Sequence, residues 1–100
     1  MSQMPVAHAS SIPSGTTQRV VVDGSEILLC NVDGEFYAID DLCSHDGGAL
    51  DQGELEDCRI ECPRHGALFD VRTGAALTLP AITPIATYPV RRDGDDLFIE

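Results

Sequence analysis

Short runs of apolar residues, separated by polar turn-forming residues, recur along the whole chain. Five runs are predicted to be the main strands: Arg19–Val22, Glu26–Val32, Phe36–Ile39, Ala86–Arg91 and Leu97–Ile99. Three shorter runs are further strand candidates: Val6–Ala7, Arg59–Glu61 and Ala67–Val71. Most of these runs are rich in β-branched and aromatic residues, which favour strands. Helical periodicity is nearly absent, and Ser10–Ser14 forms one helical turn at most because Pro13 limits it.

Asp-Gly pairs mark the turns between these runs. They occur at Asp23-Gly24, Asp33-Gly34 and Asp93-Gly94, each between two strand candidates. Glycine supplies the positive φ that tight hairpin turns require, so this dipeptide is a strong hairpin signal. We therefore predict an all-β fold, an antiparallel β-sandwich or small barrel, in a single domain over residues 1–100.

Two further segments lie between the strand candidates. Leu77–Thr87 contains Pro80 and Pro84, which argue against a central strand, so we predict an ordered loop there. The acid-rich stretch Asp51–Glu61 is expected to form a solvated hairpin, with docking to a basic partner as its alternative role.

Composition and charge disfavour several classes of function. The net charge is −11 and lysine is absent, which argues against nucleic acid and anionic membranes because phosphate contacts need basic side chains. The longest apolar runs, Val20–Val22 and Ile27–Cys30, are too short to cross a membrane. Met1–Pro5 has no basic patch followed by an apolar stretch, so we expect no signal peptide and a cytoplasmic location. In that reducing compartment, clustered cysteines indicate metal binding more often than disulfides.

Two short clusters carry the chemistry. Cys43-Ser44-His45 is followed, after 16 intervening residues, by Cys62-Pro63-Arg64-His65. Each cluster contributes one thiolate and one imidazole, and together they can hold one tetrahedral metal ion or a two-iron cluster. A Cys2His2 zinc finger groups its ligands differently, with two cysteines followed by two histidines. The predicted strands place both clusters on loops at strand ends, where a rigid scaffold can present them side by side.

The sequence around these clusters resembles the Rieske-type [2Fe–2S] ferredoxins of bacterial ring-hydroxylating dioxygenase systems. The resemblance is carried by the segments 41–50 and 60–74, and it continues through Leu79-Pro80 to the end of the chain. It implies a Rieske iron–sulfur domain with a cluster-binding subdomain of two loops, at about 43–48 and 62–67. It also implies one [2Fe–2S] cluster per chain. Its ligands are Cys43 and Cys62 on the buried iron, and His45 and His65 on the outer iron.

The same resemblance implies a soluble one-electron carrier, not an enzyme, in aromatic hydrocarbon catabolism. A flavin-containing NAD(P)H-dependent ferredoxin reductase is the implied electron donor, and a terminal Rieske non-haem iron oxygenase is the implied acceptor. The histidine count agrees with a carrier. An oxygenase also needs a mononuclear iron held by two histidines and a carboxylate, and only His8 remains beyond the cluster ligands.

Residues beside the ligands predict a low reduction potential. Respiratory Rieske proteins have a disulfide between the cluster loops, and the matching positions here are Gly48 and Arg64. They also have Ser and Tyr hydroxyls that raise the potential, where this chain has Ala67 and Phe69. We therefore predict a potential near the low end of the Rieske range, about −150 mV. The glycines Gly47, Gly48 and Gly66 are expected to make turns and to let backbone N–H groups donate to the cluster sulfurs.

Several alternatives remain open at this point. The chain could be a Rieske-type accessory protein of iron–sulfur assembly, a small subunit of another reductase, or a structural zinc-binding module. Arg64 is expected to pair with Asp46 or Asp70, or to face a partner protein. The remaining expectations are an exposed His8, a buried Cys30, a turn residue at Cys58, and an apolar collar around the histidines made by Leu68, Leu79 and Pro80.

Overall fold

The computed structural model describes residues 4–100, and short strands carry nearly all of the regular structure. The strands are β1 (Ala7–His8), β2 (Thr17–Val22), β3 (Ser25–Val32), β4 (Glu35–Asp40), β5 (Leu55–Glu56), β6 (Arg59–Glu61), β7 (Leu68–Asp70), β8 (Thr87–Tyr88), β9 (Val90–Asp93) and β10 (Asp96–Ile99). A single 3-10 turn, η1 (Ala9–Ser11), is the helical element of residues 4–100. Within that range no helix is long and apolar enough to cross a membrane. Residues 1–3, part of the segment in which we expect no signal peptide, lie outside the described residues.

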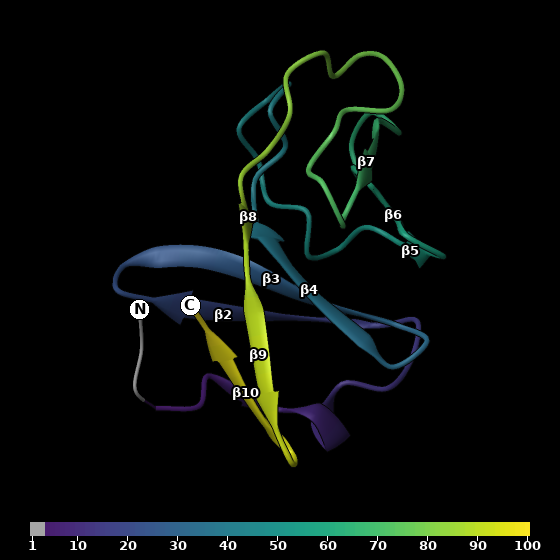
Figure 1. Cartoon of the computed structure of the whole chain (residues 1–100). Coiled ribbons are helices and arrows are strands. Elements are labelled where there is room, and N and C mark those ends of the chain that lie inside the picture. The colour runs from purple at the N-terminus through teal and green to yellow at the C-terminus, as the bar shows by residue number, and fades with distance from the viewer. Residues whose placement is uncertain (1–3) are drawn as a thin grey trace.

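The strands form three antiparallel sheets (Figure 1). The strand orders are β1-β10-β9, β2-β3-β4-β8 and β5-β6-β7. The all-β prediction is confirmed. All three orders are linear, so residues 4–100 form stacked sheets and close no barrel.

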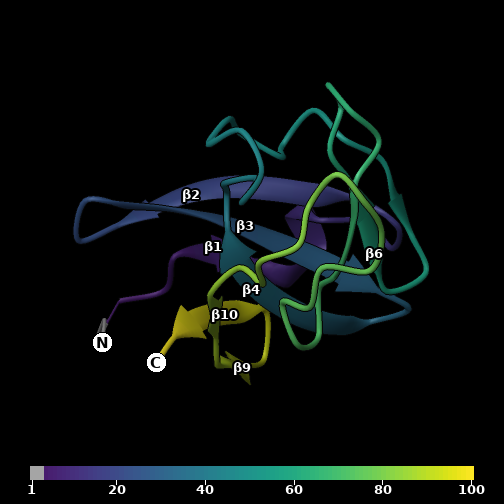
Figure 2. The same ribbon diagram turned by 90° about the horizontal axis from the view of Figure 1, so that it is seen from above.

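The central strand β3 is buried on both faces, and its two faces belong to two different cores. Ile27 and Leu29 pack with residues of β1 and β10 on one side of the sheet. Leu28 and Cys30 pack on the other side, in a core that also contains Cys43 and Cys62. Alternate residues of a strand point to opposite faces, so a continuous apolar run fits a strand covered on both sides. Seen from above, the segments between β4 and β8 lie over the β2–β3–β4 layer (Figure 2).

Two of the predicted hairpin turns form at the expected residues. Asp23-Gly24 and Asp33-Gly34 all have positive φ, and each pair joins strands in direct register. Two positive φ values match the type I′ turn that suits the twist of paired strands. The third turn is shifted by one residue: Asp93 pairs with Asp96, and Gly94 and Asp95 form the turn.

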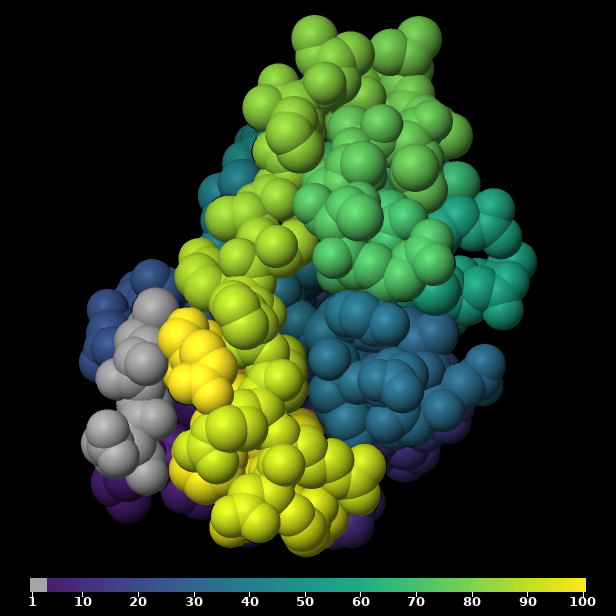
Figure 3. Space-filling model, in the orientation of Figure 1, coloured from purple at the N-terminus to yellow at the C-terminus, as the bar shows by residue number. Residues whose placement is uncertain are grey.

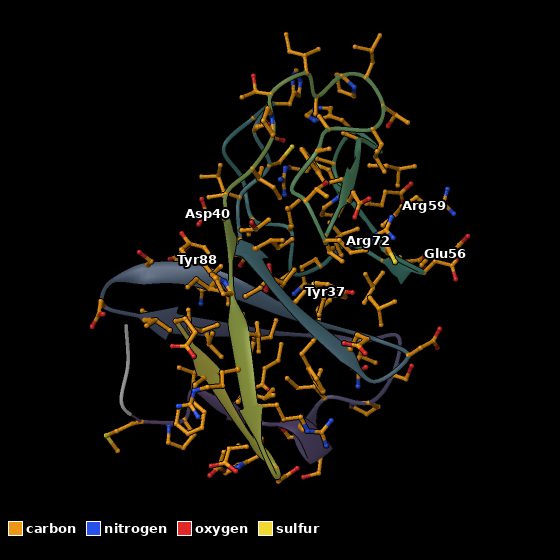
Figure 4. All side chains as sticks on the ribbon, in the orientation of Figure 1. Tyr37, Asp40, Glu56, Arg59, Arg72 and Tyr88 are labelled. Carbon is orange, nitrogen blue, oxygen red and sulfur yellow. The ribbon has the colours of Figure 1, made fainter. Side chains whose placement is uncertain are left out.

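Two strand predictions need correction. Ala86–Arg91 is not one strand, because the chain leaves β4 after β8 and pairs with β10 from β9 onward, with Pro89 between them. Proline has no N–H for a ladder, so it suits this change of sheet. Tyr88 donates a hydrogen bond to Asp40 at the end of β4. Both side chains are labelled in Figure 4. The short strand β5 was not predicted as a strand, because Asp51–Glu61 is polar and only the hairpin itself was expected.

The predicted ordered loop at Leu77–Thr87 lies against the first cluster loop. Ser44 donates a hydrogen bond from its hydroxyl to the carbonyl of Thr83. The backbone N–H of Leu68 donates to the hydroxyl of Thr78, which ties the same loop to β7. In Figure 3 the yellow-green residues of this loop form much of the upper end of the molecule.

Candidate metal centre

Two loops bring the predicted ligands together at one end of the molecule. Cys43 lies three residues after β4, and Cys62 follows β6 directly. The cysteines are buried in the same core, and the loops reach the surface beyond them. The end of β4 and the small β5-β6-β7 sheet therefore position the site.

Both loops have the same backbone turn. Cys43 N–H donates to the carbonyl of Gly48 (2.7 Å), and Gly47 N–H donates back to the carbonyl of Cys43 (2.7 Å). Cys62 makes the equivalent bonds with Ala67 (2.8 Å) and Gly66 (2.9 Å). Gly47 and Gly66 have φ of 74° and 75°, a conformation that costs other residues about 1–2 kcal/mol. A glycine four residues after each cysteine is therefore a requirement of the turn.

The turns aim backbone N–H groups at the sulfurs. Burial raises the pKa of Cys43, while hydrogen bonds from the N–H groups of His45 and Asp46 act in the opposite direction. Burial also opposes ionisation of Cys62, but hydrogen bonds from the N–H groups of Arg64 and His65, together with a hydrogen bond to Cys43 and the charge of Arg64, lower the pKa of Cys62. Each sulfur thus has donors from the residues two and three positions later. Such donors stabilise a thiolate, which is the form that binds iron.

The two histidines lie beside each other at the surface. The centroids of the His45 and His65 rings are 5.0 Å apart, and the ring planes are nearly perpendicular at 89°. His45 is the second residue after its cysteine and His65 is the third after its own, so the same turn presents the rings from different positions. Both histidines are exposed, whereas both cysteines are buried.

Asp46 is the additional polar residue that contacts the site. Its carboxylate accepts hydrogen bonds from Arg64 Nε (2.6 Å) and Nη2 (3.0 Å), and one from the N–H of Gly48 (2.9 Å). Its Oδ2 lies 3.2 Å from Nδ1 of His65. Bonding to the Arg64 guanidinium holds the pKa of Asp46 well below its usual range. Of the pairings expected for Arg64, the one with Asp46 forms, and Asp70 pairs with Arg72 instead.

The carboxylate also competes geometrically with the imidazoles. An oxygen of Asp46 and the sulfurs of Cys43 and Cys62 lie within 4.8 Å of one another, and this trio does not include either histidine. Carboxylate oxygens prefer hard ions such as Mg²⁺ and Ca²⁺, whereas thiolate and imidazole suit iron–sulfur centres. The donors that already bond to Asp46 account for its position. Two thiolates with two adjacent imidazoles therefore fit a Rieske cluster.

The expected turn-forming role of Gly47 and Gly66 is confirmed, whereas donation of backbone N–H groups to the cluster sulfurs stays a prediction. Gly47 and Gly66 donate their N–H groups to cysteine carbonyls, and Gly48 donates to the Asp46 carboxylate. The positive φ closes the turn and points these N–H groups back into it. The sulfurs receive their bonds from the residues before each glycine.

Sequence reasoning missed the structural role of Asp41. Its side chain is fully buried, and its Oδ1 accepts a hydrogen bond from the N–H of Leu50 (2.7 Å), which closes the first cluster loop. Arg19 Nε lies 3.2 Å from the other oxygen, close enough for an ion pair but without hydrogen-bond alignment. The only signal was its place directly after β4.

Of the three residues predicted to form an apolar collar, one is strongly exposed. Leu79 is 77% exposed, whereas Leu68 and Pro80 are half-buried. Ile82, in the same loop, is 80% exposed and was not predicted. Two further leucines are exposed, Leu42 directly before Cys43 and Leu77 at the start of the Leu77–Thr87 loop.

The remaining candidates behave as ordinary structural residues. Cys30 is fully buried, and burial, followed by the charge of Asp41, raises its pKa to about 12. Cys58 lies in the turn between β5 and β6, and all four cysteines, each of them described, are free thiols. His8 is exposed on β1, 3.2 Å from Oδ1 of Asp96. These predictions are confirmed.

Comparison with known proteins agrees with this geometry. Residues 2–89 match the Rieske [2Fe-2S] domain family. The chain is 44% identical, over its full length and 94% of the relative's, to a 3-phenylpropionate/cinnamic acid dioxygenase ferredoxin subunit of Shigella flexneri serotype 5b. It is also similar to the ferredoxin of carbazole 1,9a-dioxygenase from Nocardioides aromaticivorans IC177. That structure has a TM-score of 0.92 and 37% identity over 95% of this chain and 93% of that one.

A further similar structure is a complex of reduced oxygenase and oxidized ferredoxin in carbazole 1,9a-dioxygenase. Its matching chain has a TM-score of 0.90 and 32% identity, over 96% of this chain and 90% of that one. Both the family match and the identities over nearly whole chains lead to the same assignment. The chain therefore belongs to the Rieske [2Fe–2S] family, among the ferredoxin subunits of ring-hydroxylating dioxygenase systems, and its cofactor is one [2Fe–2S] cluster.

Proposed function

We propose that Cys43 and Cys62 bind one iron of the cluster and that His45 and His65 bind the other. The observation that carries this proposal is the contrast in burial: the two cysteines lie in the core, and the two histidines are exposed at the same end of the chain. The N–H groups that bond to each sulfur support thiolate ligation. We also treat residues 1–100 as one domain, because β3 contributes to both cores.

The protein is an electron-transfer component, not itself an enzyme. When bound, the cluster accepts and donates one electron. The chain excludes water from the sulfur side, because Leu50, Ile60 and Phe69 are completely buried around the cysteines. The imidazole edges at the surface are then the path by which an electron enters and leaves. Leu79 and Ile82 are exposed in the Leu77–Thr87 loop, which is hydrogen-bonded to Ser44 beside His45, and they can exclude water when a partner docks.

By likeness to the oxygenase–ferredoxin complex, we infer that a terminal Rieske oxygenase accepts the electron from this chain. A flavin-containing ferredoxin reductase is the donor that the family resemblance implies. The names of the relatives favour this role over iron–sulfur assembly, a reductase subunit or a zinc module. The net charge of −11 favours basic docking sites on both partners. The cytoplasm remains the expected location.

Single-turnover electron transfer to a terminal oxygenase tests whether the partner docks at the end of the molecule that carries His45 and His65. Leu79→Asp or Ile82→Asp is expected to slow transfer, because either places a charge among the exposed apolar side chains. Val21→Asp is the matched control, since Val21 is also apolar and 60% exposed but lies on β2. Added salt is expected to slow transfer by the unmodified protein. Equal slowing by the Val21 control variant, or no slowing by either the Leu79 or the Ile82 variant, would contradict this docking site.

A further inference from the structure

In each cluster loop one histidine and one charged residue stand next to each other, and their order is reversed between the loops. The first loop has His45 and then Asp46, whereas the second has Arg64 and then His65. The backbone turns of the two loops are the same, so the two reversed pairs of side chains face each other across the gap between the loops. The histidines lie beside each other, and the charged residues form an ion pair with two hydrogen bonds.

This pair is a bond between the loops rather than within one. Asp46 and Arg64 are 18 residues apart, and the two bonds of 2.6 and 3.0 Å give the paired geometry in which arginine binds carboxylates most strongly. The guanidinium also packs on the bare backbone of Gly48. A Cβ built there would lie 2.5 Å from Arg64 Cζ. Gly48 therefore leaves the space that the arginine occupies.

Asp46 connects the pair to the ligands on both sides. Its own N–H donates to the Cys43 sulfur, and its side chain lies 3.2 Å from the His65 ring. The N–H of Arg64 donates to the Cys62 sulfur in the same way. A change in the distance between Asp46 and Arg64 would therefore move sulfur donors on both loops.

We propose that Asp46 and Arg64 are positioning residues, a clasp that holds the two ligand loops at the separation the cluster needs and slows its release. This inference rests on the ligand assignment proposed above. The side chain of Asp46 is 19% exposed and that of Arg64 is 37% exposed, so the pair is partly shielded from water. A second bidentate pair, Asp70 and Arg72, provides a comparison, because it lies within one turn and joins no loops (Arg72 is labelled in Figure 4).

The test measures how fast the purified cluster-containing protein loses its visible absorbance in the presence of an iron chelator. Asp46→Asn and Arg64→Gln are each expected to speed this loss about two- to fivefold, the range that partly exposed ion pairs produce. The double variant is expected to be no faster than either single variant, because the two residues act as one unit. Asp70→Asn and Arg72→Gln are expected to leave the rate unchanged.

Reduction potentials distinguish positioning from a plain effect of charge. Removing the Arg64 cation disfavours the extra electron and lowers the potential, whereas removing the Asp46 anion raises it. The release rates, by contrast, are expected to rise in both variants. Arg64→Lys keeps the charge but loses the paired bonds, so it is expected to speed release without lowering the potential.

Three kinetic results would overturn the clasp, and one result on iron content would do so as well. The kinetic results are unchanged release rates in both single variants, additive effects in the double variant, or equal acceleration by the Asp70 and Arg72 variants. Purified Asp46→Asn protein lacking iron would also overturn it, because Asp46 would then be a ligand. The ligand assignment fails separately, if His45 or His65 variants retain an intact cluster.

Discussion

The two cluster loops share a backbone turn but are stabilised differently by the rest of the molecule. The first loop follows β4, and Asp41 and Ser44 tie it to its own base and to the Leu77–Thr87 loop. The second loop follows β6 directly and returns into β7, so a three-stranded sheet fixes both of its ends. The turn therefore depends on residues within each loop, whereas the distance between the two loops depends on contacts with other parts of the chain.

We expect the largest effect from replacing either of the two histidines proposed as cluster ligands. His45→Ala and His65→Ala are each expected to abolish the cluster, because three ligands leave one iron position incomplete. Iron content and the visible spectrum of the purified proteins measure this. His8→Ala is the control and should keep a full cluster, since His8 lies on β1. An intact cluster in either ligand variant would refute its role and break the equivalence of the two loops.

The shared turn makes a prediction about its two glycines. Gly47→Ala and Gly66→Ala should each destabilise the protein by about 1–2 kcal/mol, because alanine is strained at positive φ. Neither position is crowded: the nearest atom to a new Cβ is 3.9 Å away at Gly66, and none lies within 4 Å at Gly47. Urea unfolding of the cluster-containing proteins gives the values. Clearly unequal losses would show that the two turns are not energetically equivalent.

A third prediction concerns the residue that follows Gly66. Ala67 is fully buried in the core of the cysteines and has no hydroxyl. Ala67→Ser is expected to raise the potential by roughly 40 mV, the equivalent of about 1 kcal/mol for one hydrogen bond in a one-electron couple. Redox titration measures it, and Ala76→Ser, at a half-buried residue of the same core, is the control. A lowered or unchanged potential in the Ala67 variant would remove hydroxyl loss as the explanation of a low potential.

The smallest expected effect is acidic destabilisation through the Asp70 and Arg72 pair. Hydrogen bonding to Arg72 lowers the pKa of Asp70. The folded state therefore binds this proton less readily than the unfolded chain, and the contribution of the pair is present above the unfolded pKa of about 4 and lost as pH falls below it. Asp70→Asn should lessen the acid dependence of unfolding by a few tenths of a kcal/mol. An unchanged pH profile would show that the pair contributes nothing.

Much of this molecule could be predicted because its signals are local. Short apolar runs rich in β-branched and aromatic residues predicted β2, β3 and β4, and Asp-Gly pairs predicted two hairpins at the correct residues. The spacing of cysteines and histidines predicted the metal centre for the same reason. Ala86–Arg91 failed because the exchange of partners at Pro89 depends on which sheet lies nearby, and propensity carries no such information.

The sequence by itself was enough to predict the proposed ligand types, and it determined the glycines of the two turns and the strands that carry them, because each depends on residues only a few positions apart. Tertiary structure alone decided that Arg64 pairs with Asp46 rather than Asp70, that Asp41 is buried beneath the first loop, and that Ile82 is among the most exposed apolar residues. Those features join segments that are distant along the chain. Their geometry is fixed only when the two cores pack on opposite faces of β3.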